Sequence, residues 1–216
     1  MKATDALGRL HALRRPLLET REAAALLGVS TSRASQLLSS FAHAGLAIRV
    51  RRGLWSLQPD IDPTVVPPYL TAPLPAYVSF WSALHRHGMI EQIPRQVFIA
   101  SLARTQRITT PLGTFSVHHL APELFTGFES LPGGGYMATP EKALFDTIYV
   151  RAVAGGGLNL PEIELPATFR EEKLEEWNDR VARPRLRTLV ARALAEALAM
   201  AERASVVPGA LSSSEA

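Results

Sequence analysis

The spacing of apolar residues predicts two short helices joined by a tight turn near the N-terminus. Thr20 can cap the first helix, and Gly28, a residue type that commonly ends helices, follows its last apolar position. Ser30 or Thr31 can cap the second helix. A preceding helix over 4–13 has leucines on one face that can cover this pair. The apolar residues of the second helix recur at i, i+3, i+4 and i+7, which places them on one buried stripe: Ala34, Leu37, Leu38 and Phe41.

After Gly45 the pattern changes from a helical period to alternation. Apolar residues alternate along 46–50 and return along 54–57, and Arg51-Arg52-Gly53 stands between the two segments as a turn. A β-hairpin that follows the second of two such helices is typical of a winged helix-turn-helix domain. The two arginines are then expected at the tip of the wing.

The face of the second helix opposite its apolar stripe is polar and carries no acidic residue. Arginine and glutamine match the guanine and adenine edges in the major groove, and serines near a helix N-terminus can bind phosphate. The alternative is a three-helix domain that binds protein, but the face lacks the leucine or aromatic anchors that a protein interface favours. The predicted DNA contacts are Ser32, Arg33, Ser35, Gln36 and Ser40 on the helix, with Arg51 and Arg52 on the wing.

The composition changes after residue 58, where six prolines fall within 58–75. Such a segment is stiff and poor in hydrogen-bond donors, which predicts an extended linker or strap between two domains. We therefore divide the chain into a winged helix-turn-helix domain (1–58), a proline-rich linker (59–75), a second domain (76–204) and a disordered tail (205–216).

The second domain is expected to mix helices with short, locally connected strands, so that the chain is an α+β protein that ends in long helices. Ser79 can cap a helix that runs to His87, and Thr139 followed by Pro140 marks the start of another. Thr168 opens a capping-box pattern that predicts a charged helix. The expected strands are 96–101, 106–110, 114–119 and 136–138. The expected last helix is 185–204, with an apolar stripe of Leu186, Leu189, Val190, Leu194 and Leu198.

The positive charge of the chain is concentrated in its first part. Residues 1–60 hold nine Lys and Arg against four Asp and Glu, whereas 61–150 and 151–216 each carry a net charge of −1. The excess coincides with the segment predicted to read DNA, as expected of a nucleic-acid-binding domain. One such domain neutralises few phosphates, so a single copy is expected to bind weakly and with strong salt dependence.

Composition also limits the classes of function. The chain has 216 residues, 47% hydrophobic and 20% charged, which is typical of a folded globular protein. It has no cysteine, which excludes disulfides and thiolate metal sites. No segment is long and apolar enough to span a membrane, and the first residues do not form a signal peptide, so a cytoplasmic protein without membrane contact is expected.

Residues 77–150 resemble the AbiEi family, the antitoxins of type IV toxin–antitoxin (abortive phage infection) pairs. The resemblance is carried, in this order, by Val78–Gly88 with its pattern S-x-x-S-A-L-x-x-H-G, by Ile93-Pro94, and by Thr139–Asp146 with its pattern P-E-K-A-L-x-D. Together with the preceding winged helix and proline segment it covers most of residues 18–200. The resemblance implies a repressor that binds double-stranded DNA at its own promoter, where inverted repeats are expected, and a second domain that counteracts a nucleotidyltransferase-like toxin.

The alternative function is a stand-alone winged-helix transcriptional regulator whose second domain senses a ligand or mediates dimerisation. A cluster of late arginines leaves a further choice open. They form either a solvated helix face paired with the acidic residues of 171–176, or a surface that contacts the DNA backbone or an acidic partner: Arg180, Arg183, Arg185, Arg187 and Arg192.

Two groups of side chains raise the question of an enzyme or a metal site. Glu141, Lys142 and Asp146 resemble an acid–base set, but glutamate is expected in the first turn of a helix and the other two form an i, i+4 pair, so a structural or interaction role is favoured. Neighbouring histidines point apart on helices and strands, so no metal site is predicted for His85, His87, His118 and His119. We expect neither a cofactor nor catalysis.

Overall fold

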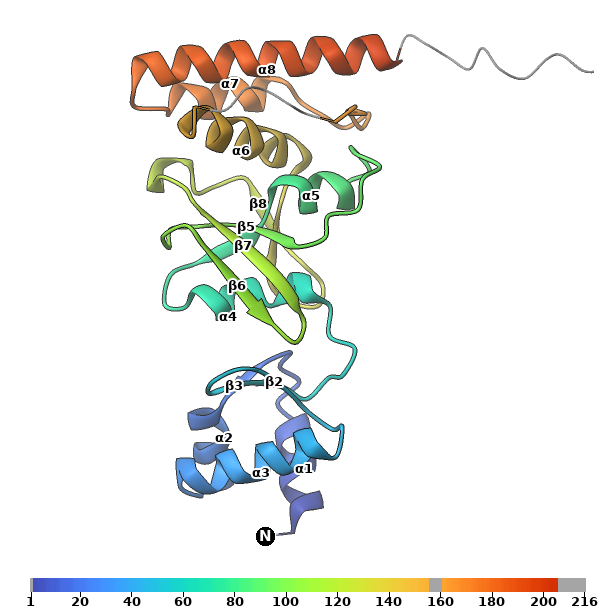
Figure 1. Ribbon diagram of the computed structural model, residues 1–216, viewed down its shortest axis with the longest axis vertical. Helices are drawn as coiled ribbons and strands as arrows, with labels where there is room; N and C mark the ends of the chain where they lie inside the picture. The colour runs from blue at the N-terminus through green and yellow to red at the C-terminus, as the bar shows by residue number, and fades with distance from the viewer. Residues whose placement is uncertain (1, 156–160, 206–216) are drawn as a thin grey trace, which may run out of the picture.

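The computed structural model describes residues 2–155 and 161–205 and is an α+β protein that ends in long helices, as predicted (Figure 1). The α-helices are α1 (Ala3–His11), α2 (Thr20–Leu27), α3 (Thr31–His43), α4 (Pro67–Thr71), α5 (Phe80–Arg86), α6 (Pro140–Val153), α7 (Glu172–Asp179) and α8 (Pro184–Ser205). The strands are β1 (Leu18–Glu19), β2 (Ile48–Arg51), β3 (Leu54–Ser56), β4 (Ala76–Val78), β5 (Val97–Ser101), β6 (Gln106–Thr110), β7 (Gly113–His119), β8 (Phe128–Ser130) and β9 (Tyr136–Ala138).

Residues 2–57, the N-terminal unit, contain the predicted sequence of two helices, a turn and a hairpin. Gly28 ends α2 with a φ of 65°, a left-handed conformation that glycine adopts without strain. Ser30 caps α3 as predicted, because its hydroxyl accepts a hydrogen bond from the Arg33 N–H at 3.2 Å. Leu38 and Phe41 are buried in the core of this unit with α1 and Trp55. The strands β1, β3 and β2 form a small antiparallel sheet beside the helices.

Thr20 does not cap α2, contrary to the prediction, because its hydroxyl has a partner elsewhere. The Trp55 Nε1–H donates to Thr20 Oγ1 at 2.9 Å, and the Thr20 N–H donates to the Gly53 carbonyl at 2.9 Å. Helix α2 begins at Thr20 itself, and the preceding residue, Glu19, donates its N–H to Glu22 Oε2 at 2.8 Å. The threonine therefore ties the helix to the hairpin.

The second unit is built on a six-stranded mixed sheet with the order β6-β7-β5-β4-β9-β8. Strand β4 pairs antiparallel with β5 and parallel with β9, and β5 pairs parallel with β7. Strands β6 and β9 match their predicted bounds, whereas β4 and β8 were not predicted from the sequence.

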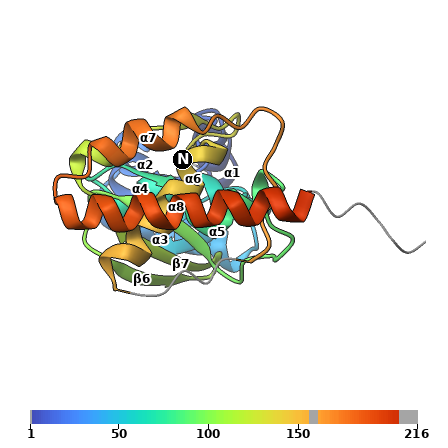
Figure 2. The same ribbon diagram turned by 90° about the horizontal axis from the view of Figure 1, so that it is seen from above.

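The C-terminal helices cover the sheet in two layers. Helices α5 and α6 lie on the face of the sheet away from the N-terminal unit, and α7 and α8 lie beyond them (Figure 1). Seen from above, α8 crosses the whole width of this layer (Figure 2). Residues 141–148 of α6 are buried without interruption, because the helix is covered on both sides. In the described part of the chain, no helix combines the length and apolar character needed to cross a bilayer.

The proline-rich segment is not an extended linker, which corrects the prediction for 59–75. It contains a 3-10 helix (Pro63–Val65) and α4. Three of its six prolines, Pro63, Pro67 and Pro68, stand in first turns, where a missing N–H costs nothing. Val66 and Leu70 are almost fully buried. They belong to one hydrophobic cluster that joins both units: Leu17, Val50, Leu54, Ile61, Val65, Val66, Leu70, Ala76, Ile99, Ala103, Phe115 and Val117.

Three further expectations change near the C-terminus. Thr168 does not open a helix, because α7 begins only at Glu172 and the N–H of Arg170 donates to Glu141 Oε1 at 3.0 Å. Leu189, expected on the buried stripe of α8, is 49% exposed. The disordered tail was predicted over 205–216, but Ser205 is the last residue of α8; the rest of the predicted tail, 206–216, lies outside the described residues.

Close packing at Gly127 generates a testable prediction. A Cβ at this position would lie 2.5 Å from Cζ2 of Trp177, a rigid ring, and the φ of 77° disfavours any side chain. We expect Gly127→Ala to lower the free energy of unfolding by about 1–3 kcal/mol through overpacking, in addition to backbone strain. Urea unfolding measures this change. Gly88→Ala is the matched control, because Gly88 has a φ of 70° and open space around its Cα. Equal losses in both variants would show that the ring adjusts freely.

Candidate nucleic-acid interface

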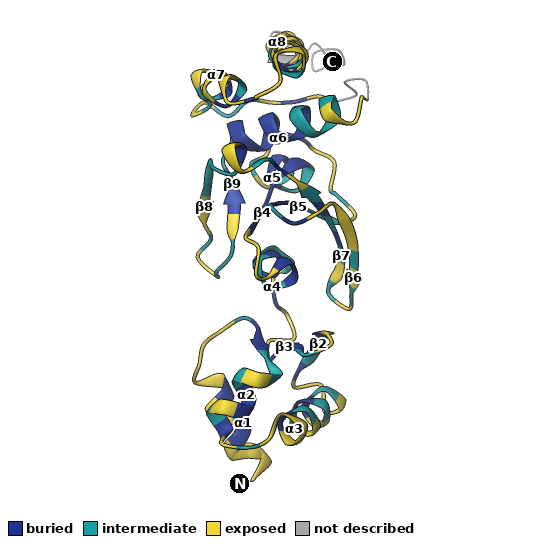
Figure 3. Ribbon diagram, turned by 90° about the vertical axis from the view of Figure 1, so that its left-hand side faces the viewer, coloured by how far each residue is buried: buried dark blue, intermediate teal, exposed yellow. Residues whose placement is uncertain are grey.

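The polar face of α3 is exposed at the end of the molecule opposite α8 (Figures 1 and 3). Ser30 and Gly28 fix the start of the helix, and its buried stripe holds it against α1 and α2. The opposite face is consequently turned outward. Of the predicted contacts on it, Ser35 is partly buried and the remainder are exposed: Ser32, Arg33, Gln36 and Ser40.

Hydrogen bonds within α3 organise this face. Arg33 Nη1 donates to Gln36 Oε1 at 3.3 Å, which holds the two side chains side by side one turn apart. The Ser40 hydroxyl donates to the Leu37 carbonyl at 2.7 Å and keeps its acceptor lone pairs for another partner. Arginine and glutamine at this spacing offer both hydrogen-bond donors and acceptors to a ligand that binds against this face of α3.

Arg51 is exposed but has partners within the chain, so it is not the free side chain expected at a wing tip. Its guanidinium donates from Nη2 to the Tyr69 carbonyl at 2.7 Å and from Nη1 to the Leu70 carbonyl at 3.0 Å. Both carbonyls belong to α4, so Arg51 is directed at the second unit. The hairpin lies between the two units and not at the outer end of the molecule (Figure 3). Arg52 is exposed and has no partner among the described residues.

A charged cluster in the second unit brings together residues that the sequence placed far apart. Asp146 accepts hydrogen bonds from the Tyr77 hydroxyl at 2.9 Å and the Ser79 hydroxyl at 2.7 Å, and it pairs with Lys142. Ser79 therefore does not cap α5 with its side chain, contrary to the prediction. The Lys142 ammonium also lies over the rings of Phe145 and Trp177.

Burial dominates the electrostatics of this cluster. It raises the pKa of Asp146 and lowers the pKa of Lys142, while the attraction between the two charges opposes both changes. Burial and the adjacent carboxylate raise the pKa of Tyr77 well above its ordinary value, which keeps the phenol a hydrogen-bond donor. The side chains of Lys142 and Asp146 are 0% exposed, so a substrate cannot reach them in this conformation. Their geometry is that of a structural cluster.

The histidines serve separate local contacts. His85 Nδ1 lies 3.3 Å from the Ile90 carbonyl, and His87 Nε2 lies 2.7 Å from the Ala138 carbonyl. His118 packs against Phe80 with ring centroids 4.9 Å apart, and burial lowers its pKa. Among the described residues, no group of three or more potential ligands gathers as a metal site would require.

Three of the five late arginines have local partners. Arg192 pairs with Glu196 at 2.8 Å along α8, Arg187 donates to the Val181 carbonyl at 3.0 Å, and Arg180 donates to Thr126. The acidic residue Glu176 pairs with Lys173 on its own helix. None of these contacts is the expected pairing of a late arginine with an acidic residue of 171–176.

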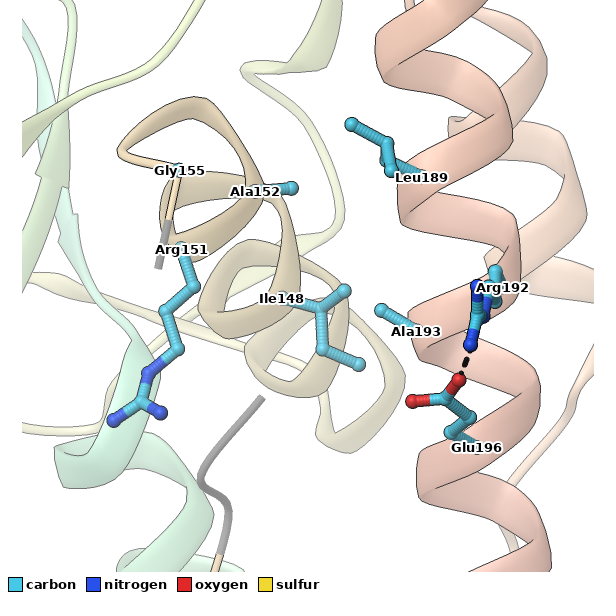
Figure 4. Close-up of a pocket in the computed structure, with 8 residues that line it drawn as sticks. All are labelled: Ile148, Arg151, Ala152, Gly155, Leu189, Arg192, Ala193 and Glu196. Carbon is cyan, nitrogen blue, oxygen red and sulfur yellow. Dashed lines mark hydrogen bonds and ion pairs between the residues drawn. The ribbon is translucent and has the colours of Figure 1, made fainter. Parts of the chain in front are cut away.

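A groove between α6 and α8 has a volume of about 280 Å³ (Figure 4). Ile148 and Ala152 face Leu189 and Ala193 across it, and the Arg192–Glu196 pair runs along α8 at its side. This volume lies below the usual range of small-molecule pockets, about 300–1,000 Å³. The groove is mostly apolar and holds none of the predicted site residues.

Comparison with models of known protein families gives no match for this chain. Comparison with curated proteins gives none either. The resemblance to AbiEi antitoxins therefore stays a prediction, and the argument for function depends on the geometry of α3.

The buried Lys142–Asp146 pair generates the next prediction. Removing one partner leaves an uncompensated charge in the core, so Lys142→Met and Asp146→Asn are each expected to lower the free energy of unfolding by about 3–5 kcal/mol. The double variant removes both charges and should lose clearly less than the sum of the two single losses. Urea unfolding of the four proteins completes the cycle, and additive losses would contradict a direct coupling between the two groups.

Proposed function

We propose that this protein is a DNA-binding regulator that reads duplex DNA with α3. The observation that carries the proposal is the outward polar face of α3, on which Arg33 and Gln36 are exposed and hydrogen-bonded to each other. An α-helix of this kind fits the major groove, where arginine recognises guanine and glutamine recognises adenine. The N-terminus of α3 supplies main-chain N–H groups for a phosphate. The net charge of +5 in residues 1–60 supports the same role.

We further propose that the regulator is an antitoxin of the AbiEi type, which represses its own promoter and counteracts a nucleotidyltransferase-like toxin. This part of the proposal is supported by the order of the sequence motifs in 78–88 and 139–146. The first of these motifs forms α5 and the second forms the start of α6, and Ser79 and Asp146 are in direct contact between them. The motifs thus belong to the core of the second unit.

Variants of α3 test the reading role. We expect Arg33→Ala and Gln36→Ala each to reduce the preference for the promoter over random duplex by about 1–3 kcal/mol, because each removes a contact to base edges. Titrations of both duplexes with each variant measure the preference. Arg192→Ala is the charge-matched control, since Arg192 is exposed at the opposite end of the molecule. A loss of preference in this control equal to that of Arg33→Ala would contradict the assignment.

The antitoxin role is tested in cells. Expression of a nucleotidyltransferase-like protein encoded beside this chain is expected to arrest growth, and co-expression of this chain is expected to restore it. The variants Arg33→Ala and Gln36→Ala should still restore growth when both genes are driven by a foreign promoter, because repression is then bypassed. Growth arrest that this chain does not relieve would leave the stand-alone regulator as the better account.

A further inference from the structure

The β2–β3 hairpin is packed between the two units and not extended into solvent. Val50 and Leu54 are 2% and 3% exposed and belong to the hydrophobic cluster that also contains Val65 and Phe115 of the second unit. A hairpin that buries its apolar residues in this way is not free to move toward a DNA groove. Its position relative to the second unit is fixed by packing.

Polar contacts hold the hairpin on both sides. On the side of the N-terminal unit, the Gly53 carbonyl accepts from the Thr20 N–H, and Trp55 donates to the Thr20 hydroxyl. On the side of the second unit, Arg51 donates to α4.

The pairing of β2 with β3 skips Val50, which is the mark of a β-bulge between Arg49 and Arg51. Bulges redirect side chains, and this one precedes the arginine that contacts α4.

The two α4 carbonyls that Arg51 contacts lack the backbone N–H donors that a continuing helix would provide. In a helix that continued, the Tyr69 carbonyl would accept from residue 73, but Pro73 has no N–H. The next N–H, that of Leu74, donates to the Thr71 carbonyl instead at 3.0 Å. The guanidinium of Arg51 supplies the donors with its two-pronged geometry, which a lysine ammonium does not reproduce.

We propose that the hairpin couples the DNA-reading unit to the second unit, and that Arg51 is the positioning residue of this joint and not a DNA contact. The claim that Arg51 does not contact DNA rests on the proposed function, whereas the claim that the hairpin joins the two units does not. Arg52, its neighbour in the turn, is exposed and makes no contact across this joint. The second unit thereby sets the orientation in which α3 is presented.

Three variants test the proposal: Arg51→Ala, Arg51→Lys and Arg52→Ala. Hydrogen–deuterium exchange on the full chain reports on the joint. We expect Arg51→Ala and Arg51→Lys to raise amide exchange in both β2–β3 and α4 by roughly fivefold, because the fork of hydrogen bonds is lost in each. Arg52→Ala should leave this exchange unchanged. Exchange in α6, which lies beyond the sheet, serves as the internal reference.

Salt-dependent titration of promoter duplex reports on DNA contact. We expect Arg51→Ala and Arg51→Lys both to keep the wild-type slope of log affinity against log salt, because neither removes a contact to phosphate. The proposal is overturned if Arg51→Ala lowers the slope by about one, Arg51→Lys restores it, and neither changes exchange. If the wild-type protein binds no duplex, the proposed function fails, and unchanged exchange in the Arg51 variants would then refute the joint independently.

Discussion

The apolar contact between the hairpin and the second unit is the constraint on which the arrangement of this protein depends. Burial of Val50 and Leu54 beside Val65 removes apolar surface from water where the small sheet of the N-terminal unit packs against the second unit. The same contact leaves α3 on the outside, because the hairpin and α3 lie on different sides of their shared core. Exposure of the polar helix face is thus a consequence of where the hairpin is buried.

The second unit is organised by a different kind of constraint, a buried charge pair. Lys142 and Asp146 lie in the middle of α6, where eight consecutive residues are buried, and removal of both charges from water is unfavourable unless each is fully partnered. Tyr77 and Ser79, on β4 and at the start of α5, provide the missing hydrogen bonds. The pair therefore fixes one register of α6 against β4 and α5. We regard it as a source of specificity in packing more than of net stability.

Local patterns were sufficient to predict features that depend on neighbours in sequence. The cap of α3 by Ser30 and the bounds of β6 follow from residues within a few positions of one another. Thr20 and Ser79 were misassigned because hydrogen-bond partners distant in sequence, Trp55 and Asp146, compete for their hydroxyls. The extended form predicted for the proline-rich segment is wrong, and the partners of Arg51 are not predictable from the sequence, for the same reason: both depend on packing between the units, which periodicity does not report.

Under the proposed function, the placement of α3 and α8 at opposite ends limits how the second unit can influence DNA binding. A small molecule bound to the C-terminal helices lies far from α3 in this arrangement, so its influence on a duplex there would pass through the contacts between the two units. Coupling of this kind is reciprocal: if a partner of the second unit changes the affinity for DNA, DNA changes the affinity for that partner by the same factor. The path contains one polar joint with defined geometry, between Arg51 and the carbonyls of α4, beside the apolar cluster. The two-pronged hydrogen bond of Arg51 adds a directional requirement to the close packing of the cluster around it, so the angle between the units depends on both.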